Sequence, residues 1–245
     1  MIRIEMTNVR KRFYRGNKAQ ILGAVGWKKL FSRRDWFLAL DQVSFSVTNP
    51  GTCLGIIGSN GSGKTTLLRI IAGVTDPTSG TVIINGRVVP LLEASAGMQP
   101  DLTGRENIFL NGAVLGMRRR EIARKLDSIV HFAGVKDFID MPLKHYSSGM
   151  ITRLGFGVAS HVEADILLVD ETWSMTDISF QEKSFDRLSH LRKKGAVLFL
   201  VSHDPNLIRS MADNVLWLEK GRVIRIGPTD EVLNAYLHTT SSKKS

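Results

Sequence analysis

The sequence predicts an α/β fold in which a mixed sheet with an N-terminal antiparallel part is interrupted by a block of helices. Residues 2–6 and 43–47 alternate between apolar and polar side chains as half-buried strands do, and a third strand is expected at 81–84. Residues from about 161 to 235 alternate apolar strands with helices, as a parallel sheet with crossover helices requires. Between these parts, residues from about 91 to 160 show helical spacing.

We expect one domain over residues 1–238, with the helical block as a subdomain of approximately 91–160 and a polar, frayed tail over 239–245. A chain of 245 residues can bury a substantial core. Its content of 43% hydrophobic and 23% charged residues is ordinary for a soluble globular protein.

Nothing in the sequence predicts a membrane span or a secreted protein. No run approaches about 18 uninterrupted apolar residues, and the N-terminus lacks the apolar core of a signal peptide. The single cysteine, Cys53, excludes an internal disulfide, and its place in an apolar run indicates a small buried side chain. The sequence therefore predicts a cytosolic protein.

The formal net charge of +10 leaves three interpretations open. Basic residues crowd the first 34 positions and recur at 118–120 and 192–194. They can bind nucleic acid, bind the anionic face of a membrane, or simply be exposed to solvent. Because no basic motif is interleaved with aromatic residues, we expect no nucleic-acid partner. The mixed apolar and basic segment at 21–37 fits either a membrane interface or a loop covering a sheet edge.

A glycine-rich loop between a predicted strand and a predicted helix points to phosphate binding. Its residues match G-x-x-x-x-G-K-[ST] and are Gly58, Ser59, Asn60, Gly61, Ser62, Gly63, Lys64 and Thr65, with Thr66 next in the helix. Glycines let successive backbone N–H groups point at phosphate oxygens, and the helix N-terminus adds partial positive charge. Lys64 supplies a full charge to the β and γ phosphates, and the Thr65 hydroxyl can bind Mg²⁺. The fold class is therefore a P-loop NTPase core, with ATP and Mg²⁺ as expected cofactors.

Two more predicted strands end in polar residues that suit nucleotide hydrolysis. An apolar run ends in Asp170 and Glu171, at the edge where open α/β sheets bind ligands. We expect Asp170 to bind Mg²⁺ and Glu171 to orient and deprotonate the attacking water. A second run ends before His203, which can hydrogen-bond the γ phosphate. The other histidines, at 131, 145, 161, 190 and 238, have no such placement and are expected to be structural or surface residues.

The order of these motifs resembles the ATP-binding cassette (ABC) family over essentially the whole chain. Between the loop and Asp170 lies YSSGM at 146–150, which is similar to the family signature LSGGQ. The resemblance implies that Ser147 and Gly149 cover the γ phosphate bound by a second copy. It therefore implies a head-to-tail pair with two composite sites, closed by ATP and opened by hydrolysis. The isolated domain can still be monomeric, because the closed form depends on nucleotide.

Three features depart from the family pattern. Asp177 stands six residues beyond Glu171, as a subunit-contacting loop requires, but bulky Trp173 and Met175 lie between them. The family usually has a glutamine in the loop that links the ATP site to the membrane subunit, and this sequence has no clear counterpart. Glu93 lies at roughly that position, and its carboxylate can bind Mg²⁺ or belong to the shell of the attacking water. Gln99 is the weaker candidate. For the aromatic platform under adenine, Phe13 fits the spacing better than Tyr14.

Within the family, three segments resemble the ATPase subunits that export capsular polysaccharide, O-antigen or teichoic acid in bacteria. They are 102–108, YSSGM at 146–150 and 180–183. The resemblance implies an enzyme that couples ATP hydrolysis to transport of a lipid-linked polysaccharide through a separate integral membrane permease. Its expected place is the cytoplasmic face of the inner membrane, with Arg105, Glu106, Asn107 and residues 117–120 as the docking surface. Because the chain ends soon after residue 232, we expect the glycan to be recognised by the permease or by short segments that this domain presents to it. The alternative is a soluble ABC ATPase acting on nucleic acid or ribosomes.

Overall fold

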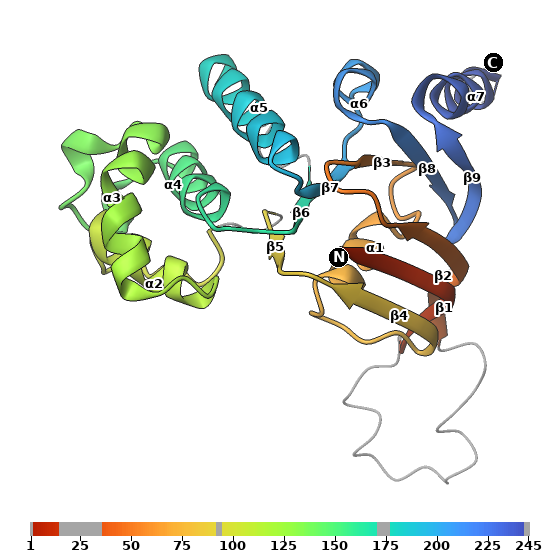
Figure 1. The fold of residues 1–245 in the computed structure, drawn as a ribbon, viewed down its shortest axis with the longest axis horizontal. Helices are drawn as coiled ribbons and strands as arrows, with labels where there is room; N and C mark the ends of the chain where they lie inside the picture. Colours follow the sequence, from red (N-terminus) through yellow and green to blue (C-terminus); the bar gives the residue numbers. More distant parts are fainter. Residues whose placement is uncertain (1, 15–35, 92–94, 171–176, 243–245) are drawn as a thin grey trace, which may run out of the picture.

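The computed structural model describes residues 2–14, 36–91, 95–170 and 177–242, and it contains two sheets and a separate group of helices (Figure 1). The first sheet is antiparallel, with strand order β2-β1-β4. Its strands are β1 (Arg3–Tyr14), β2 (Trp36–Val47) and β4 (Ser79–Asn85). All three predicted N-terminal strands are therefore confirmed, although β1 and β2 are longer than the alternating segments.

The second sheet has six strands in the order β5-β6-β7-β3-β8-β9. Its strands are β3 (Cys53–Ile57), β5 (Val88–Pro90), β6 (Ile166–Val169), β7 (Val197–Val201), β8 (Asn214–Glu219) and β9 (Arg222–Pro228). Neighbours from β5 to β8 are parallel, and β9 is antiparallel to β8. The predicted mixed α/β fold is thereby confirmed.

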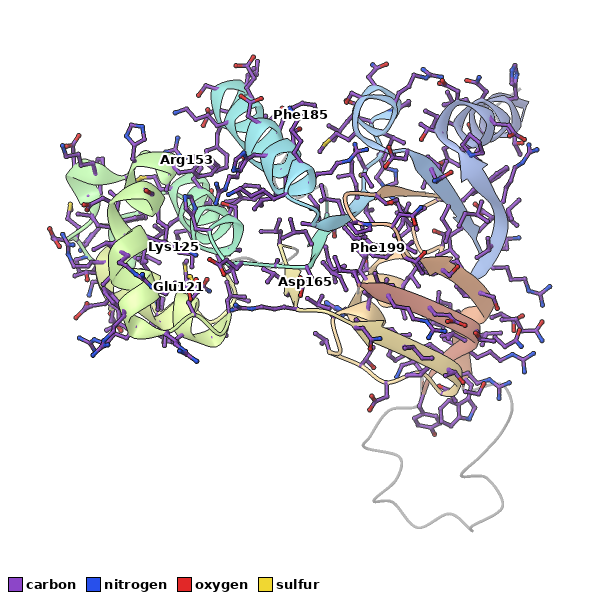
Figure 2. All side chains as sticks on the ribbon, in the orientation of Figure 1. Glu121, Lys125, Arg153, Asp165, Phe185 and Phe199 are labelled. Atoms are coloured by element: carbon purple, nitrogen blue, oxygen red, sulfur yellow. The ribbon has the colours of Figure 1, made fainter. Side chains whose placement is uncertain are left out.

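Alternate residues of the central strands face two cores. On β7, Phe199 packs near Phe45 in the core shared with the antiparallel sheet and α1 (Lys64–Ile71), while Leu198 and Leu200 face the opposite side (Figure 2). That opposite side is covered by α5 (Ile178–Lys193), α6 (Pro205–Met211) and α7 (Thr229–Ser242). A strand buried on both faces reads as a continuous apolar run, as seen in the sequence of β7.

The helical block lies between β5 and β6 in the chain and to the side of the sheets in space (Figure 1). It comprises α2 (Gly104–Val114), α3 (Arg119–Ala133), η4 (Lys136–Phe138), η5 (Leu143–His145) and α4 (Ser148–Ser160). Phe132, Phe156 and Phe180 join α3, α4 and α5 through ring contacts with centroids 5.4–6.0 Å apart. These helices fall inside the predicted block at 91–160.

The expected fraying of the tail is wrong for its first residues, because α7 continues to Ser242. The Thr239 hydroxyl donates to the Ala235 carbonyl (2.9 Å), and that of Thr240 donates to Tyr236 (3.0 Å). These bonds satisfy polar side chains within the helix, so polar composition alone did not indicate its end. Among the described residues, no helix combines the length and apolar character that a bilayer crossing requires.

One buried carboxylate joins the two sheets. Asp41 on β2 accepts hydrogen bonds from Arg10 on β1 (3.0 Å) and from Arg222 on β9 (2.8 Å), and its backbone N–H donates to Gly221 O (2.8 Å). The Asp41 side chain is only 8% exposed. The hydrogen bond from Arg222 is the main reason that the pKa of Asp41 lies below its usual value.

We expect Asp41→Asn to lower the free energy of unfolding at neutral pH by about 1–2 kcal/mol, because a charge-assisted pair is weakened. A lowered folded-state pKa stabilises the fold above the unfolded-state pKa, and this stabilisation is lost as the pH falls through the folded-state value. The difference between wild type and variant should therefore shrink below about pH 4 in urea titrations. Asp230→Asn, in the exposed pair with Arg209, is the control and should change stability little. Equal effects of both variants at neutral pH would contradict the assignment.

Candidate functional site

The glycine-rich loop connects the buried strand β3 to the N-terminus of α1, as predicted. Two glycines are required by their surroundings. Gly58 has φ +147°, and a Cβ there would lie 1.9 Å from the Leu218 carbonyl oxygen. Gly63 has φ +109°, and its Cβ would lie 2.6 Å from the Ala39 carbonyl oxygen. The loop is therefore pressed between β2 and β8, and only glycine fits at these two points.

Contacts with the turn between β8 and β9 also hold the loop. The Gly221 N–H donates to Ser62 O (2.8 Å), and the Ser59 hydroxyl donates to a carboxylate oxygen of Glu219 (2.9 Å). Because Gly221 also accepts from Asp41, the buried ion-pair cluster and the loop are directly connected. The loop geometry is thus fixed by the protein itself rather than by a ligand.

A cavity of about 230 Å³ opens beside this loop. It contains eight of the residues predicted for nucleotide binding and hydrolysis: Asn60, Gly61, Gly63, Lys64, Thr65, Thr66, Asp170 and His203. Phe37, Ala39 and Val201 complete the lining. The ends of β6 and β7 therefore meet the loop at one edge of the sheet, as expected for parallel strands.

Within this cavity the loop offers groups that suit phosphate. The buried Lys64 ammonium donates to the carbonyl oxygens of Gly58 (2.8 Å) and Ser59 (3.1 Å), which hold the charge against the loop. The Ser62 hydroxyl is buried without a hydrogen-bond partner among the described residues, but Ser62 does not line the cavity. The ammonium of Lys64 and the loop backbone therefore suit a polyphosphate chain.

The predicted metal ligands are described only in part. Thr65 at the start of α1 and Asp170 after β6 both line the cavity, and oxygen donors of this kind suit Mg²⁺. His203 lines it from the end of β7. Glu171 and Glu93 lie outside the described residues, so their roles stay predictions. Gln99 is described, and its exposed side chain does not line the cavity.

The aromatic residue at the cavity is one that the sequence reasoning missed. Phe37 on β2 lines the cavity, whereas Phe13 does not. The two residues are opposite each other in the antiparallel ladder, so their side chains leave the same face of the sheet. Tyr14 instead packs edge-to-face on Trp36, with centroids 5.4 Å apart. Recognising that the strand extends to Trp36 would have identified Phe37.

The signature segment begins helix α4 and does not line the cavity beside the loop of its own chain. Ser147 is the N-cap of α4, and its exposed hydroxyl accepts the Met150 N–H (3.2 Å). Buried Tyr146 anchors this end through a hydrogen bond to Phe138 O (2.7 Å). Neither Ser147 nor Gly149 lines the cavity, and α4 stands well apart from α1 (Figure 1). Within one chain, this segment does not reach the phosphate site.

An ion pair joins the signature helix to the start of α5. Arg153 donates to one Asp177 oxygen (3.1 Å), while the other Asp177 oxygen caps α5 by accepting the Phe180 N–H (2.9 Å). Asp177 therefore has a defined structural position at the end of the segment that follows Glu171. Trp173 and Met175 lie outside the described residues.

Part of the expected docking surface is buried. The Asn107 side chain is fully buried and bonds the backbone of Gln99, Leu102 and Thr103, and Met117 is 4% exposed. Glu106 closes a capping box with Thr103. Asn107 and Met117 therefore shape the helical block from inside, and the expectation that they contact a partner is wrong.

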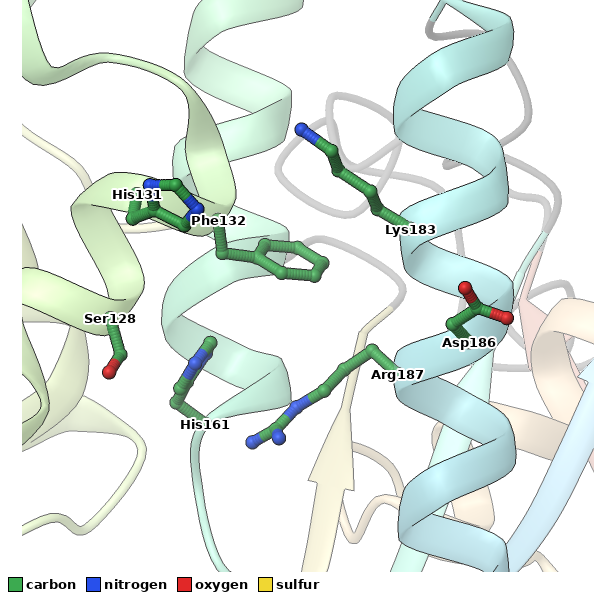
Figure 3. Close-up of a pocket in the computed structure, with 7 residues that line it drawn as sticks. All are labelled: Ser128, His131, Phe132, His161, Lys183, Asp186 and Arg187. Atoms are coloured by element: carbon green, nitrogen blue, oxygen red, sulfur yellow. The ribbon is translucent and has the colours of Figure 1, made fainter.

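A second hollow, of about 410 Å³, lies between α3, the end of α4 and α5 (Figure 3). It shares no residue with the nucleotide cavity. His161 lines it, with a ring nitrogen 2.7 Å from Gly157 O. Burial lowers the pKa of His161 to about 4, so its imidazole is neutral near pH 7. This histidine has the structural environment that the sequence predicted.

Comparisons with known proteins agree with this geometry. The model of the ABC transporter family matches residues 40–174. An O-antigen export system ATP-binding protein, RfbB, from Klebsiella pneumoniae is 42% identical over 82% of this chain and 81% of its own length. A teichoic acids export ATP-binding protein, TagH, from Lactococcus lactis is 44% identical over 82% of this chain and 42% of its own length.

Solved structures share the fold. The ATP-binding subunit of an ABC transporter superimposes with a TM-score of 0.75 at 22% identity, covering 95% of this chain and 92% of the other. A dimeric ATP-binding cassette bound to ADP and Pi gives 0.73 at 23% identity, covering 92% and 98%. By the family match and the sequence identity to its relatives, the chain belongs to the ABC transporter family, as one of its ATP-hydrolysing ATP-binding subunits.

Proposed function

We propose that this chain is the motor subunit of a bacterial exporter that moves a lipid-linked polysaccharide, such as O-antigen or a capsule polymer, across the inner membrane. The observation that carries the motor role is the gathering of Lys64, Thr65, Asp170 and His203 around one cavity. The polysaccharide is inferred from relatives whose names specify export of O-antigen or teichoic acids.

Each of the proposed site residues has a different role in ATP binding and hydrolysis. The loop amides and Lys64 bind the phosphate chain, and Phe37, with Phe13 beside it, provides an aromatic surface for the adenine ring. Thr65 and Asp170 would hold Mg²⁺, which neutralises charge on the phosphates, with Glu93 contributing to its shell. Glu171 accepts a proton from the attacking water, and His203 donates a hydrogen bond to the γ phosphate.

Because the signature segment does not reach the cavity of its own chain, a second copy is part of this proposal. In a head-to-tail pair, Ser147 and the N-terminal amides of α4 from one copy cover the γ phosphate held by the other. The dimeric cassette with the same fold supports such pairing. ATP closes the pair, and hydrolysis removes the phosphate that both copies contact.

The proposed membrane partner is a separate permease that binds this subunit at the cytoplasmic face of the inner membrane. The exposed surface of the helical block is the proposed contact, excluding the buried Asn107 and Met117. The relatives described above are export proteins and give no support to the alternative, a soluble ATPase acting on nucleic acid or ribosomes.

Affinity purification of the chain from its own cell membranes in mild detergent tests the proposed function. We expect an integral membrane protein to co-purify and to stimulate ATP turnover when both are placed in lipid vesicles. Recovery of RNA or DNA that survives high salt, with no membrane protein, would overturn the exporter proposal, because weak charge attraction is screened by salt.

Glu171→Gln should retain ATP binding and slow hydrolysis by about 10² to 10⁴, because the amide cannot accept the water's proton. Lys64→Ala is the matched comparison, since loss of the ammonium should weaken ATP binding and turnover together. Nucleotide affinity and single-turnover rates separate these outcomes. Normal hydrolysis by Glu171→Gln would show that another residue is the general base.

A further inference from the structure

A hollow of about 760 Å³ lies at the opposite end of the sheet from the nucleotide cavity. One wall is Arg87, whose carbonyl accepts from Asp165 and Ile166 at the amino end of β6. The other wall is the start of α3, where Figure 2 shows Glu121 and Lys125. The hollow shares no residue with the nucleotide cavity, so any ligand here would be bound independently of ATP.

The charges in this hollow do not balance. Lys125 pairs with both of the acidic lining residues, Glu121 (2.7 Å) and Glu163 (3.7 Å). The four lining arginines have no carboxylate within ion-pair distance among the described residues; they are Arg87, Arg118, Arg120 and Arg124. Five basic and two acidic residues therefore line the hollow, and its four guanidinium groups form no ion pair with a carboxylate of the described residues.

Several surface arginines elsewhere in the described residues pair with carboxylates, although Arg12 and Arg119 do not. Carboxylates lie within 3.1 Å of five arginines: Arg105, Arg153, Arg192, Arg209 and Arg225. At the hollow, by contrast, Arg120 and Arg124 are one helical turn apart, a spacing at which like charges destabilise a helix. Arg87 is also fixed in place, because its guanidinium donates to Leu115 O (2.7 Å). Such an excess of positive charge on neighbouring side chains destabilises the fold unless an anion binds it.

We propose that this hollow binds a phosphate-bearing ligand carrying at least two negative charges, at a site separate from the nucleotide. A planar guanidinium group can donate two parallel hydrogen bonds to two oxygens of one phosphate, and four such groups line this hollow. Because the hollow is open to solvent, each contact is weak, so a multiply charged group is favoured over a single carboxylate. None of the lining residues is aromatic, so the hollow lacks the stacking surface that single-stranded nucleic acid uses.

The phosphate can come from a soluble diphosphate or from the headgroups of a membrane. The test uses the full chain saturated with ADP, so that the glycine-rich loop is occupied. Inorganic pyrophosphate is titrated by calorimetry at low ionic strength. Wild type is compared with the triple variant Arg118→Gln, Arg120→Gln, Arg124→Gln. The matched control, Arg3→Gln, Arg209→Gln, Arg225→Gln, removes the same net charge from paired, exposed positions away from the hollow.

Wild type and control should bind pyrophosphate similarly, and the triple variant should bind about tenfold more weakly or worse. ADP affinity should be the same in all three proteins, and neither variant should melt at a clearly lower temperature than wild type, which shows that each is folded. Equal weakening of the triple variant and the control would overturn the proposal, since net charge alone would then explain binding. Absence of pyrophosphate binding by wild type would overturn it too.

Sedimentation with vesicles distinguishes the two sources of phosphate. Vesicles of phosphatidylcholine, with or without phosphatidylglycerol, are mixed with the same three proteins. If the triple variant alone loses binding to the anionic vesicles, lipid headgroups reach the hollow. If all three proteins bind the vesicles equally, but the triple variant binds pyrophosphate more weakly than the other two, the ligand is a soluble phosphate compound. Either result supports a phosphate site at these arginines.

Discussion

The close packing of the glycine-rich loop against β2 and β8 is the constraint on which the site depends. Gly58 touches the Leu218 carbonyl, Gly63 touches that of Ala39, and Gly221 bonds Ser62 on the third side. These contacts come from segments far apart in the sequence, and the Asp41 ion pairs hold the same segments together. The two sheets therefore bury apolar surface and also hold the backbone of the glycine-rich loop in place. Phosphate binding then does not have to include the free-energy cost of ordering this loop.

A second constraint is the separation of the loop from the signature helix. Tyr146 anchors the N-terminus of α4 on the helical block, and Arg153 connects that helix to Asp177 at the start of α5. The helix end is thus held rigidly, yet it does not reach the cavity of its own chain. In the proposed head-to-tail pair, the signature segment of one copy meets the loop of the other, which accounts for its distance from the loop of its own chain. The Arg153–Asp177 pair would also link each signature helix to the segment that follows Glu171, the proposed general base.

Local patterns in the sequence indicated the elements around the site because these carry strong signals. Continuous apolar runs mark β3, β6 and β7, and each predicted polar residue that is described at their ends lies near the cavity, as Asp170 and His203 show. The far ends of β1 and β2 were missed because β-bulges and Asn8, at φ +51°, break the alternation, and Phe37 was missed with them. Asn107 was misjudged as a surface residue because nothing local indicates that its amide bonds three backbone carbonyls. Whether such a residue is buried or exposed depends on tertiary contacts, which the local sequence does not reveal.

Disulfide cross-linking between two variants that each add one cysteine tests the central claim, the shared phosphate site, most directly. Asn60→Cys places a thiol at the cavity, and Ser148→Cys places one at the start of α4. The native Cys53 is buried and its pKa is raised to about 12, so it stays unreactive. In a Glu171→Gln background with ATP, a mixture of the two variants should form a disulfide-linked dimer, while ADP or either variant alone should give none. Absence of the linked dimer with ATP, or equal linking with ADP, would contradict a site built from two copies.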